Sequence, residues 1–263
     1  MVRPRYFADY WTLRPWVSNP WRVSVFREER RPDVRLEVGF RHQSPIELRS
    51  ATPDHHMFHR IYVRDEYRLG RPGERSWGTV LDLGGNVGIF ASRVSPYAER
   101  VLTFEPVPAN FEQLSHNLSG YANVTPIPKG VSSKPATVTV YEPKHKALTG
   151  AFSMHSDSGG LMSDDSFDIE VVSLDSVFEE YEIDRCDLMK IDIEGHEYEV
   201  LYESSDSTLA KIQTIAGEYH DVSPEDPRTR IENFERYLQE LGFRVDVVPH
   251  RKKPNHGMFF ASR

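Results

Sequence analysis

The chain has 263 residues, of which 38% are hydrophobic and 27% charged, and its formal net charge is −8. This length suits one large domain, or one domain with an appendage. No apolar run approaches the about 18 residues that cross a bilayer, so neither a membrane span nor a membrane partner is predicted. The N-terminus lacks the apolar core of a secretory signal. The single cysteine, Cys186, excludes an internal disulfide framework and a cysteine-based zinc site, and a cytoplasmic location is the simplest interpretation.

The charge is spread unevenly along the chain. Residues 1–75 hold 15 Arg, no Lys and 10 acidic residues, a balance of +5 (15 − 10), so the remainder carries −13 (−8 − 5). The acidic remainder argues against a nucleic-acid partner, which would need a basic track. Residues 1–54 are rich in arginine and aromatic residues, and we expect them to form an arm that packs on the body or joins two copies in a homo-oligomer. An aromatic lid or a platform for the substrate is the alternative.

The main domain is predicted to occupy residues 55–263. Apolar residues at helical spacing predict a helix from about 55 to 69. From residue 78 onward, strand patterns alternate with helix patterns, as in a doubly wound α/β sheet. The first elements of this alternation are strands at 79–83, 101–105 and 124–128, with a helix at 108–118.

After the third strand the order changes. Two runs with period-two patterning, 136–141 and 168–173, flank a polar segment, 142–167, rich in Gly, Ser and Asp. They predict an antiparallel insertion at about 136–173, whose long polar tip is a candidate lid. The alternation then resumes, with strands at 186–192 and 212–218, a helix from about 194, a helix from 231 to Gly242, and final strands at 244–248 and 256–261. The expected result is a seven-stranded, mostly parallel sheet with helices on both faces and an antiparallel last strand.

The most informative segment is the turn after the first strand, which Asp82 ends. The turn contains Gly84, Gly85, Asn86 and Gly88. A strand, a tight turn and a helix N-terminus together cradle nucleotide-like ligands, and glycine lets such a ligand approach the backbone N–H groups. A dinucleotide fingerprint would require glycine at Leu83, which disfavours a nicotinamide-dependent dehydrogenase. An acid two residues before the first glycine instead suits a ligand with a hydroxyl or amino group, such as S-adenosylmethionine.

A second acid, Glu105, ends the next strand 23 residues after Asp82 (105 − 82). A carboxylate about 20 residues beyond the first strand is where a ribose diol is bound. Glu105 is therefore a predicted ribose ligand. The adenine is expected beyond the third strand, near Gly130, on its position alone.

With these motifs, the chain resembles the FkbM family of S-adenosylmethionine-dependent methyltransferases over roughly residues 55–262. The resemblance rests on residues 80–90, 104–111, 173–176 and 187–201. Its most specific part is the run Lys-Ile-Asp-x-Glu-Gly-x-Glu that starts at Lys190, whereas Gly85 stands where the family usually has alanine. The resemblance implies a class I methyltransferase fold and O-methylation of a hydroxyl on a small molecule such as a sugar, a glycolipid or a polyketide-type natural product.

Candidate catalytic residues follow the fourth and fifth strands, because open α/β sheets place their sites at the carboxyl ends of strands. An alcohol is a weak nucleophile while protonated, so a base or a metal is expected. We predict Asp192 and Glu194 as site carboxylates, Asp192 also as a cofactor ligand, and His220 as the base. Glu197 is expected to pair with the strand lysine or a backbone amide. No metal is favoured, although Asp192, Glu194 and Glu218 are suitable Mg²⁺ ligands.

Two other functions stay open. A methyltransferase acting on RNA or protein would differ in its acceptor, although residues 190–195 lack the Asn/Asp-Pro-Pro-aromatic run of amine methylation, and Arg185 rather than proline precedes Cys186. A catalytically silent relative would bind the cofactor and serve as a scaffold. Turnover and cofactor affinity, measured separately, distinguish these cases.

Overall fold

The computed structural model describes residues 4–29, 31, 33–71, 73–143, 162–193, 195–220, 226–251 and 253–263. The first elements are α1 (Pro4–Leu13), α2 (Pro20–Phe26), β1 (Arg35–Val38), β2 (Ile46–Arg49), α3 (Asp54–Phe58), the π-helical turn η1 (His59–Val63), β3 (Trp77–Leu83), α4 (Ile89–Val94), the 3₁₀ turn η2 (Ser95–Tyr97), β4 (Ala98–Phe104), α5 (Pro108–Leu118) and β5 (Val124–Ile127). They are followed by β6 (Gly130–Ser132), β7 (Ala136–Pro143), β8 (Met162–Ser173), α6 (Leu174–Glu180), β9 (Leu188–Ile191), α7 (Glu197–Tyr202), α8 (Asp206–Leu209), β10 (Thr214–His220), the 3₁₀ turn η3 (Pro227–Thr229), α9 (Ile231–Glu240), β11 (Arg244–His250) and β12 (Lys253–Ser262).

A seven-stranded sheet with the order β11-β12-β10-β9-β3-β4-β5 forms the centre of the molecule. β3 pairs in parallel with β4 and β9, and β5 and β10 extend this parallel set on either side. β12 is inserted between β10 and β11 and runs antiparallel to both. The fold class is therefore the predicted one, a class I methyltransferase sheet whose last strand is reversed.

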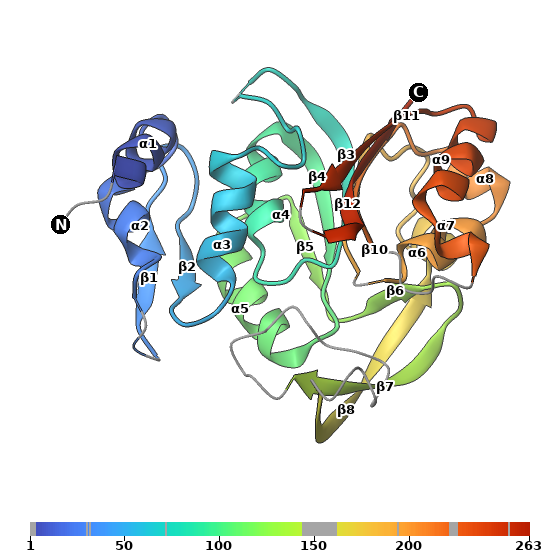
Figure 1. Cartoon of the computed structure of the whole chain (residues 1–263), viewed down its shortest axis with the longest axis horizontal. Helices are drawn as coiled ribbons and strands as arrows, with labels where there is room; N and C mark the ends of the chain where they lie inside the picture. The colour runs from blue at the N-terminus through green and yellow to red at the C-terminus, as the bar shows by residue number, and fades with distance from the viewer. Residues whose placement is uncertain are drawn as a thin grey trace.

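Helices cover both faces of this sheet, with α4 and α5 on one side and α6 to α9 on the other (Figure 1). Successive residues of a strand point to opposite faces, so β3 contributes to two cores. Leu81 and Leu83 pack with residues of α6, α7 and α9, whereas Val80 packs with residues of α4 and α5. The buried second half of β3, Val80–Leu83, is apolar except for Asp82, as expected for a strand covered on both sides.

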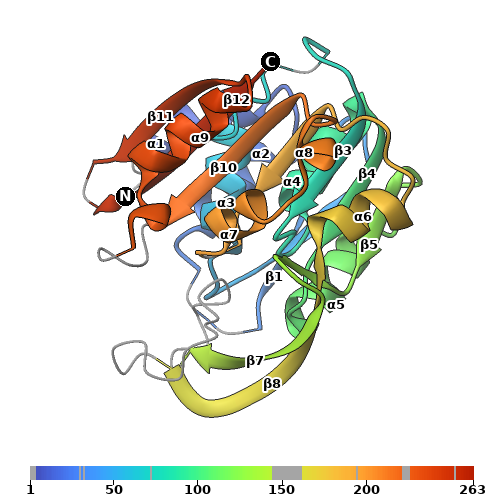
Figure 2. The same cartoon turned by 90° about the vertical axis from the view of Figure 1, so that its right-hand side faces the viewer.

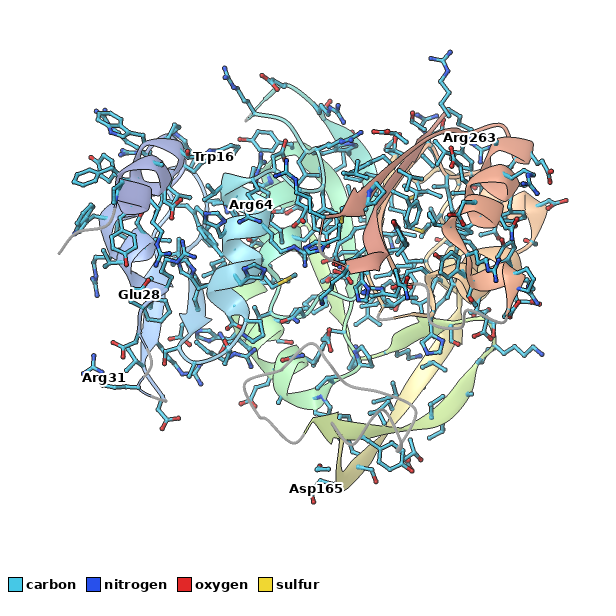
Figure 3. The ribbon with its side chains drawn as sticks, in the orientation of Figure 1. Trp16, Glu28, Arg31, Arg64, Asp165 and Arg263 are labelled. Carbon is cyan, nitrogen blue, oxygen red and sulfur yellow. The ribbon has the colours of Figure 1, made fainter. Side chains whose placement is uncertain are left out.

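Residues from α1 to β2 pack on the α4–α5 side of the sheet, and Leu13, Val23 and Leu48 belong to the same core as Val80. Trp16, labelled in Figure 3, lies between this N-terminal layer and the body, with its ring 6.2 Å from that of Tyr62. The N-terminal segment therefore packs on the body. A domain boundary between residues 54 and 55 and a homo-oligomer remain predictions.

The predicted helix from 55 to 69 is too long, because α3 and η1 end at Val63. Asp65 and Arg68 have positive φ angles of 49° and 54°, respectively, which a continuing helix does not allow. The Asp65 carboxylate accepts hydrogen bonds from the backbone N–H groups of Leu69 and Gly70 at 2.8 and 2.9 Å, which fixes the turn. Apolar spacing alone did not reveal this stop.

The insertion pairs β7 with β8 antiparallel, and β6 joins β8 in parallel. Both views show this hairpin projecting away from the central sheet (Figures 1 and 2). β7 extends to Pro143 and β8 starts at Met162, so the expected polar loop is shorter than 142–167 at both ends. The predicted lid falls on residues 144–161, outside the described residues. No helix among the described ones has the length and apolarity needed to cross a bilayer.

Candidate functional site

The glycine turn follows β3 directly and is held by the end of β4. The backbone N–H groups of Gly84 and Gly85 donate to the Phe104 carbonyl at 3.0 and 2.8 Å. Gly84 and Gly88 have φ angles of +85° and +83°, and a Cβ on Gly84 would lie 2.0 Å from the Asp192 carbonyl oxygen. A Cβ on Gly85 would collide with Thr103 at 2.2 Å. Packing and backbone conformation thus require these glycines, whereas the sequence argument had invoked only the approach of a ligand.

Asp82 lies beneath this turn and is fully buried. Its Oδ1 is 3.1 Å from Lys190 Nζ, an ion pair without hydrogen-bond alignment, and its Oδ2 accepts from the Thr103 hydroxyl at 2.9 Å. Lys190 also donates to the Leu83 and Gly84 carbonyls at 3.2 and 2.6 Å. Asp82 and Lys190 therefore connect β3, β9 and the glycine turn. The predicted role of Asp82 as a cofactor ligand remains a prediction.

Glu105 stands at the end of β4 with its carboxylate against the turn. It accepts from the backbone N–H groups of Asn86 at 2.8 Å and Val107 at 2.9 Å. Burial raises the pKa of Glu105 to about 7 despite these hydrogen bonds. A carboxylate has about four lone-pair sites, so acceptor capacity remains for ligand hydroxyls.

Asn86 and Gly130 complete the predicted cofactor residues. Asn86 Oδ1 is buried and has no hydrogen-bond partner among the described residues. A buried acceptor of this kind is normally satisfied, so a ligand that donates a hydrogen bond fits this position. Gly130 begins β6, where a Cβ would lie 3.0 Å from Val171.

The ends of β9 and β10 bring three predicted residues together. The ligand atoms of Asp192, Glu218 and His220 all lie within 4.8 Å of one another. Asp192 follows the last residue of β9, Ile191, so the strand predicted for 186–192 ends one residue before it. Glu194 lies outside the described residues.

Residues from the segment before β3 approach the same carboxylates. The Tyr67 hydroxyl donates to Asp192 Oδ2 at 2.9 Å, and Arg60 donates to Glu218 Oε2 at 2.6 Å. Arg60 also pairs with Glu66. Burial opposes ionisation of Asp192, but Lys190 and Arg60 hold its pKa below the ordinary value. Burial and the neighbouring Asp192 raise the pKa of Glu218 even though Arg60 is beside it.

His220 is held by a buried carboxylate. Its Nδ1 lies 3.2 Å from Glu197 Oε1, and Glu197 is 0% exposed. Glu197 also accepts from the backbone N–H groups of Ile193 at 3.0 Å and Gly195 at 3.0 Å, so its position is fixed. Of the two partners expected for Glu197, backbone amides are therefore observed, whereas Lys190 pairs with Asp82. A proton on Nδ1, directed at Glu197, makes Nε2 the basic nitrogen of the neutral ring.

Sequence reasoning missed four contributors to this site. They are Arg60, Tyr67, the His-orienting role of Glu197, and His256 of β12, whose ring lies 4.7 Å from that of His220. His256 is the cross-strand neighbour of His220 in the β10–β12 register. The proximity of His256 to His220 could therefore be predicted only once the order and register of the strands are known. Arg60 and Tyr67 carry no such signal, because one arginine among 15 in residues 1–75 is not distinctive.

Comparison with known proteins defines the class. A model of the FkbM methyltransferase domain matches residues 82–245. The chain therefore belongs to the FkbM methyltransferase family. It is 31% identical over 147 residues to the hexuronic acid methyltransferase AglP of Haloferax volcanii, and this match covers 55% of the chain and 57% of AglP. The chain thus spans little more than half the length of that relative.

Two further similarities were found. The chain is 27% identical over 199 residues to the methyltransferase sdnD of Sordaria araneosa, covering 63% of the chain and 73% of sdnD. Among solved structures, fibrillarin from Aeropyrum pernix, in complex with S-adenosyl-L-methionine, superposes with a TM-score of 0.43 at 14% identity, covering 90% of the chain and 86% of fibrillarin.

Proposed function

We propose that this chain is an S-adenosylmethionine-dependent O-methyltransferase that methylates a hydroxyl of a sugar or a comparable small molecule. The observation that carries this proposal is the buried Glu197–His220 pair beside Asp192. It lies next to the glycine turn, since the Asp192 carbonyl contacts Gly84. The name of the relative AglP, a hexuronic acid methyltransferase, supports a sugar as the acceptor.

The residues of the turn fit the cofactor. Glu105 offers acceptor capacity for the ribose hydroxyls, and Asn86 Oδ1 is a buried acceptor without a partner among the described residues. When bound, S-adenosylmethionine would supply a methyl group already activated by the sulfonium. Neither Asn86 nor Glu105 therefore has to activate the methyl carbon, and their proposed role is to bind and orient.

The acceptor hydroxyl must lose a proton as its oxygen forms the new bond. We assign His220 Nε2 as the general base, a role that typically contributes about 10²–10⁴ in rate. Glu197 keeps the ring in the tautomer with Nδ1–H and stabilises the imidazolium that results. Asp192, fixed by Tyr67, is a suitable acceptor for a second substrate hydroxyl and so helps to position the nucleophile. Glu194 keeps its predicted role as a site carboxylate.

A metal-assisted variant of the same reaction is the alternative mechanism. The geometry favours Asp192, Glu218 and His220 as the donor set, because their ligand atoms lie within 4.8 Å of one another. Mg²⁺ prefers oxygen ligands, whereas an imidazole suits Zn²⁺, Fe²⁺ or Ni²⁺. Arg60 already compensates the charge of Glu218. We therefore keep Mg²⁺ as the less favoured mechanism, and turnover that survives a chelator would remove it.

The test separates catalysis from cofactor binding. His220→Gln should lower kcat by about 10²–10⁴ and leave the affinity for S-adenosylhomocysteine within about twofold, because the ring is assigned to the acceptor. His196→Gln is the matched control, since His196 is a partly exposed histidine at the start of α7. Full activity of His220→Gln would eliminate His220 as the base.

The same assay distinguishes the remaining functions. Wild-type protein that binds S-adenosylhomocysteine but methylates no hydroxylated sugar or polyketide would favour an RNA or protein acceptor. Absence of turnover on those acceptors as well would favour a cofactor-binding scaffold.

A further inference from the structure

The outward face of α1 and α2 exposes most of the large hydrophobic side chains found exposed in the described residues. Phe7, Trp11 and Trp21 are 53%, 62% and 39% exposed, and the fourth such residue, Val248, is on β11. The rings of Phe7 and Trp21 are 5.6 Å apart, and Tyr10 lies 5.5 Å from Trp11 and 6.5 Å from Trp21. Scattered exposed apolar residues are ordinary, but a contiguous patch marks an interaction surface.

The exposed charges carried by α1 and α2 themselves are basic. Within residues 4–26 the only acidic residue is Asp9, which is buried, whereas Arg14 and Arg22 are exposed. The exposed Arg5 is paired with Glu28, just after α2, and is not counted in the face. Arg14 lies over the Trp11 ring at 5.4 Å, and Arg41 donates to the Arg14 carbonyl at 2.9 Å. The face therefore combines aromatic rings with arginines and attracts anionic partners.

We propose that this aromatic–arginine face, formed by Phe7, Trp11, Trp21, Arg14 and Arg22, docks the protein on an anionic lipid surface. An amphipathic helix that lies flat on a bilayer places its aromatic rings at headgroup depth while its arginines contact acidic lipids. α1 has this form, because Tyr6 and Leu13 face the protein while Phe7 and Trp11 face outward. Figure 1 places α1 and α2 at the end of the molecule away from α8 and α9.

A second copy of the chain fits this face less well. A stable interface usually takes about 20–30 residues from each partner, whereas this patch has three strongly apolar anchors. A two-fold contact would also set the arginines of one copy against those of the other, which opposes association. The prediction of no membrane partner rested only on the absence of a spanning segment, and the proposed surface docking departs from it.

The experiment is co-sedimentation of the full chain with vesicles of phosphatidylcholine alone and of phosphatidylcholine mixed with phosphatidylglycerol. We expect binding only to the anionic vesicles, weakened by salt, with a blue shift of tryptophan emission. The variant Phe7→Ser/Trp11→Ser/Trp21→Ser should lower the partition coefficient by about tenfold or more. Val248→Ser, which removes the exposed hydrophobic residue outside the face, is the matched control and should bind like the wild type.

A second variant tests the charge separately. Arg14→Gln/Arg22→Gln should lower binding by roughly fivefold per arginine at low salt, and it leaves the rings in place. Unchanged S-adenosylhomocysteine affinity and unfolding temperature show that each variant is folded. Absence of binding to anionic vesicles would overturn the proposal. So would a dimer in light scattering that the triple variant dissociates, because the face would then serve self-association.

Discussion

The two halves of the candidate site are built in different ways. In the cofactor half, Glu105 and the glycine turn are held by backbone groups of neighbouring segments, as in the bonds from Asn86 and Val107. In the acceptor half, side chains hold side chains: Tyr67 binds Asp192, and Glu197 binds His220. The contributors to that half come from separate parts of the chain.

This difference has a consequence for specificity. Arg60 and Tyr67 precede the segment matched by the family model, 82–245, and His256 follows it. The cofactor half lies entirely within the matched segment. We therefore expect family members to share the cofactor half and to differ in the acceptor half, since function resides in sites built on a fold.

The largest expected effect concerns the ion pair that joins the two halves. Lys190 on β9 is 2% exposed and pairs with Asp82 on β3, which is 0% exposed. Lys190→Met removes one partner of a buried pair and should lower the free energy of unfolding by about 3–5 kcal/mol, because the Asp82 charge is left uncompensated. Urea unfolding measures this.

Lys211→Met is the matched control for that prediction. Lys211 donates to the Ile183 carbonyl at 3.1 Å but has a partly exposed side chain, so its loss should cost about 1 kcal/mol or less. If both variants were equally stable, the Asp82–Lys190 pair would not join the halves energetically.

The next effect tests the acceptor half alone. Glu197→Gln places an amide beside His220 and favours the tautomer with the proton on Nε2, which removes the base. We expect kcat to fall about 10²-fold, equivalent to about 2.7 kcal/mol, with unchanged cofactor affinity. Glu199→Gln is the matched control, because Glu199 is a largely exposed acid on the same helix. Equal turnover of the two variants would contradict the orienting role of Glu197.

The same contrast explains what the sequence could predict. The apolar strands, the Asp82–Gly88 turn and Glu105 follow one another within 24 residues (82 to 105), and local patterning encodes them. The strand pattern also predicted the reversal of the last strand, whereas the order of the strands in the sheet was not predicted. Asp192, Glu218 and His220 were found because strand ends are recognisable positions.

The rest depends on tertiary contacts that no local pattern specifies. Arg60 reaches Glu218 across 158 residues of chain, and Tyr67 reaches Asp192 across 125. The end of η1 was missed because the Asp65 side chain, rather than glycine or proline, forms the turn. The glycines of the turn were identified correctly but explained incompletely, since Gly84 lies against Asp192, just after β9, and Gly85 lies against Thr103 of β4.

The smallest effect tests the cofactor half through pH. Burial raises the pKa of Glu105 to about 7 in the folded protein, above its ordinary value of 4.5. For the protein without ligand, the neutral carboxyl is the favoured folded form. The contribution of Glu105 to stability is thus fully present below pH 4.5 and is lost as the pH rises through about 7.

Ligand binding has the opposite sign. In the proposed ribose site the hydroxyls would donate to the ionised carboxylate. Affinity for S-adenosylhomocysteine should therefore be constant well above pH 7 and fall about tenfold per pH unit well below it, which is about 1.4 kcal/mol per unit. Calorimetric titration across this range measures the change. Glu105→Gln cannot ionise, so its affinity should be lower at high pH, by about 1–3 kcal/mol, and independent of pH, with the wild-type curve descending towards it. If the wild-type affinity for S-adenosylhomocysteine were also independent of pH, Glu105 would not belong to the ribose site, because its carboxylate would then titrate without contact with the ligand.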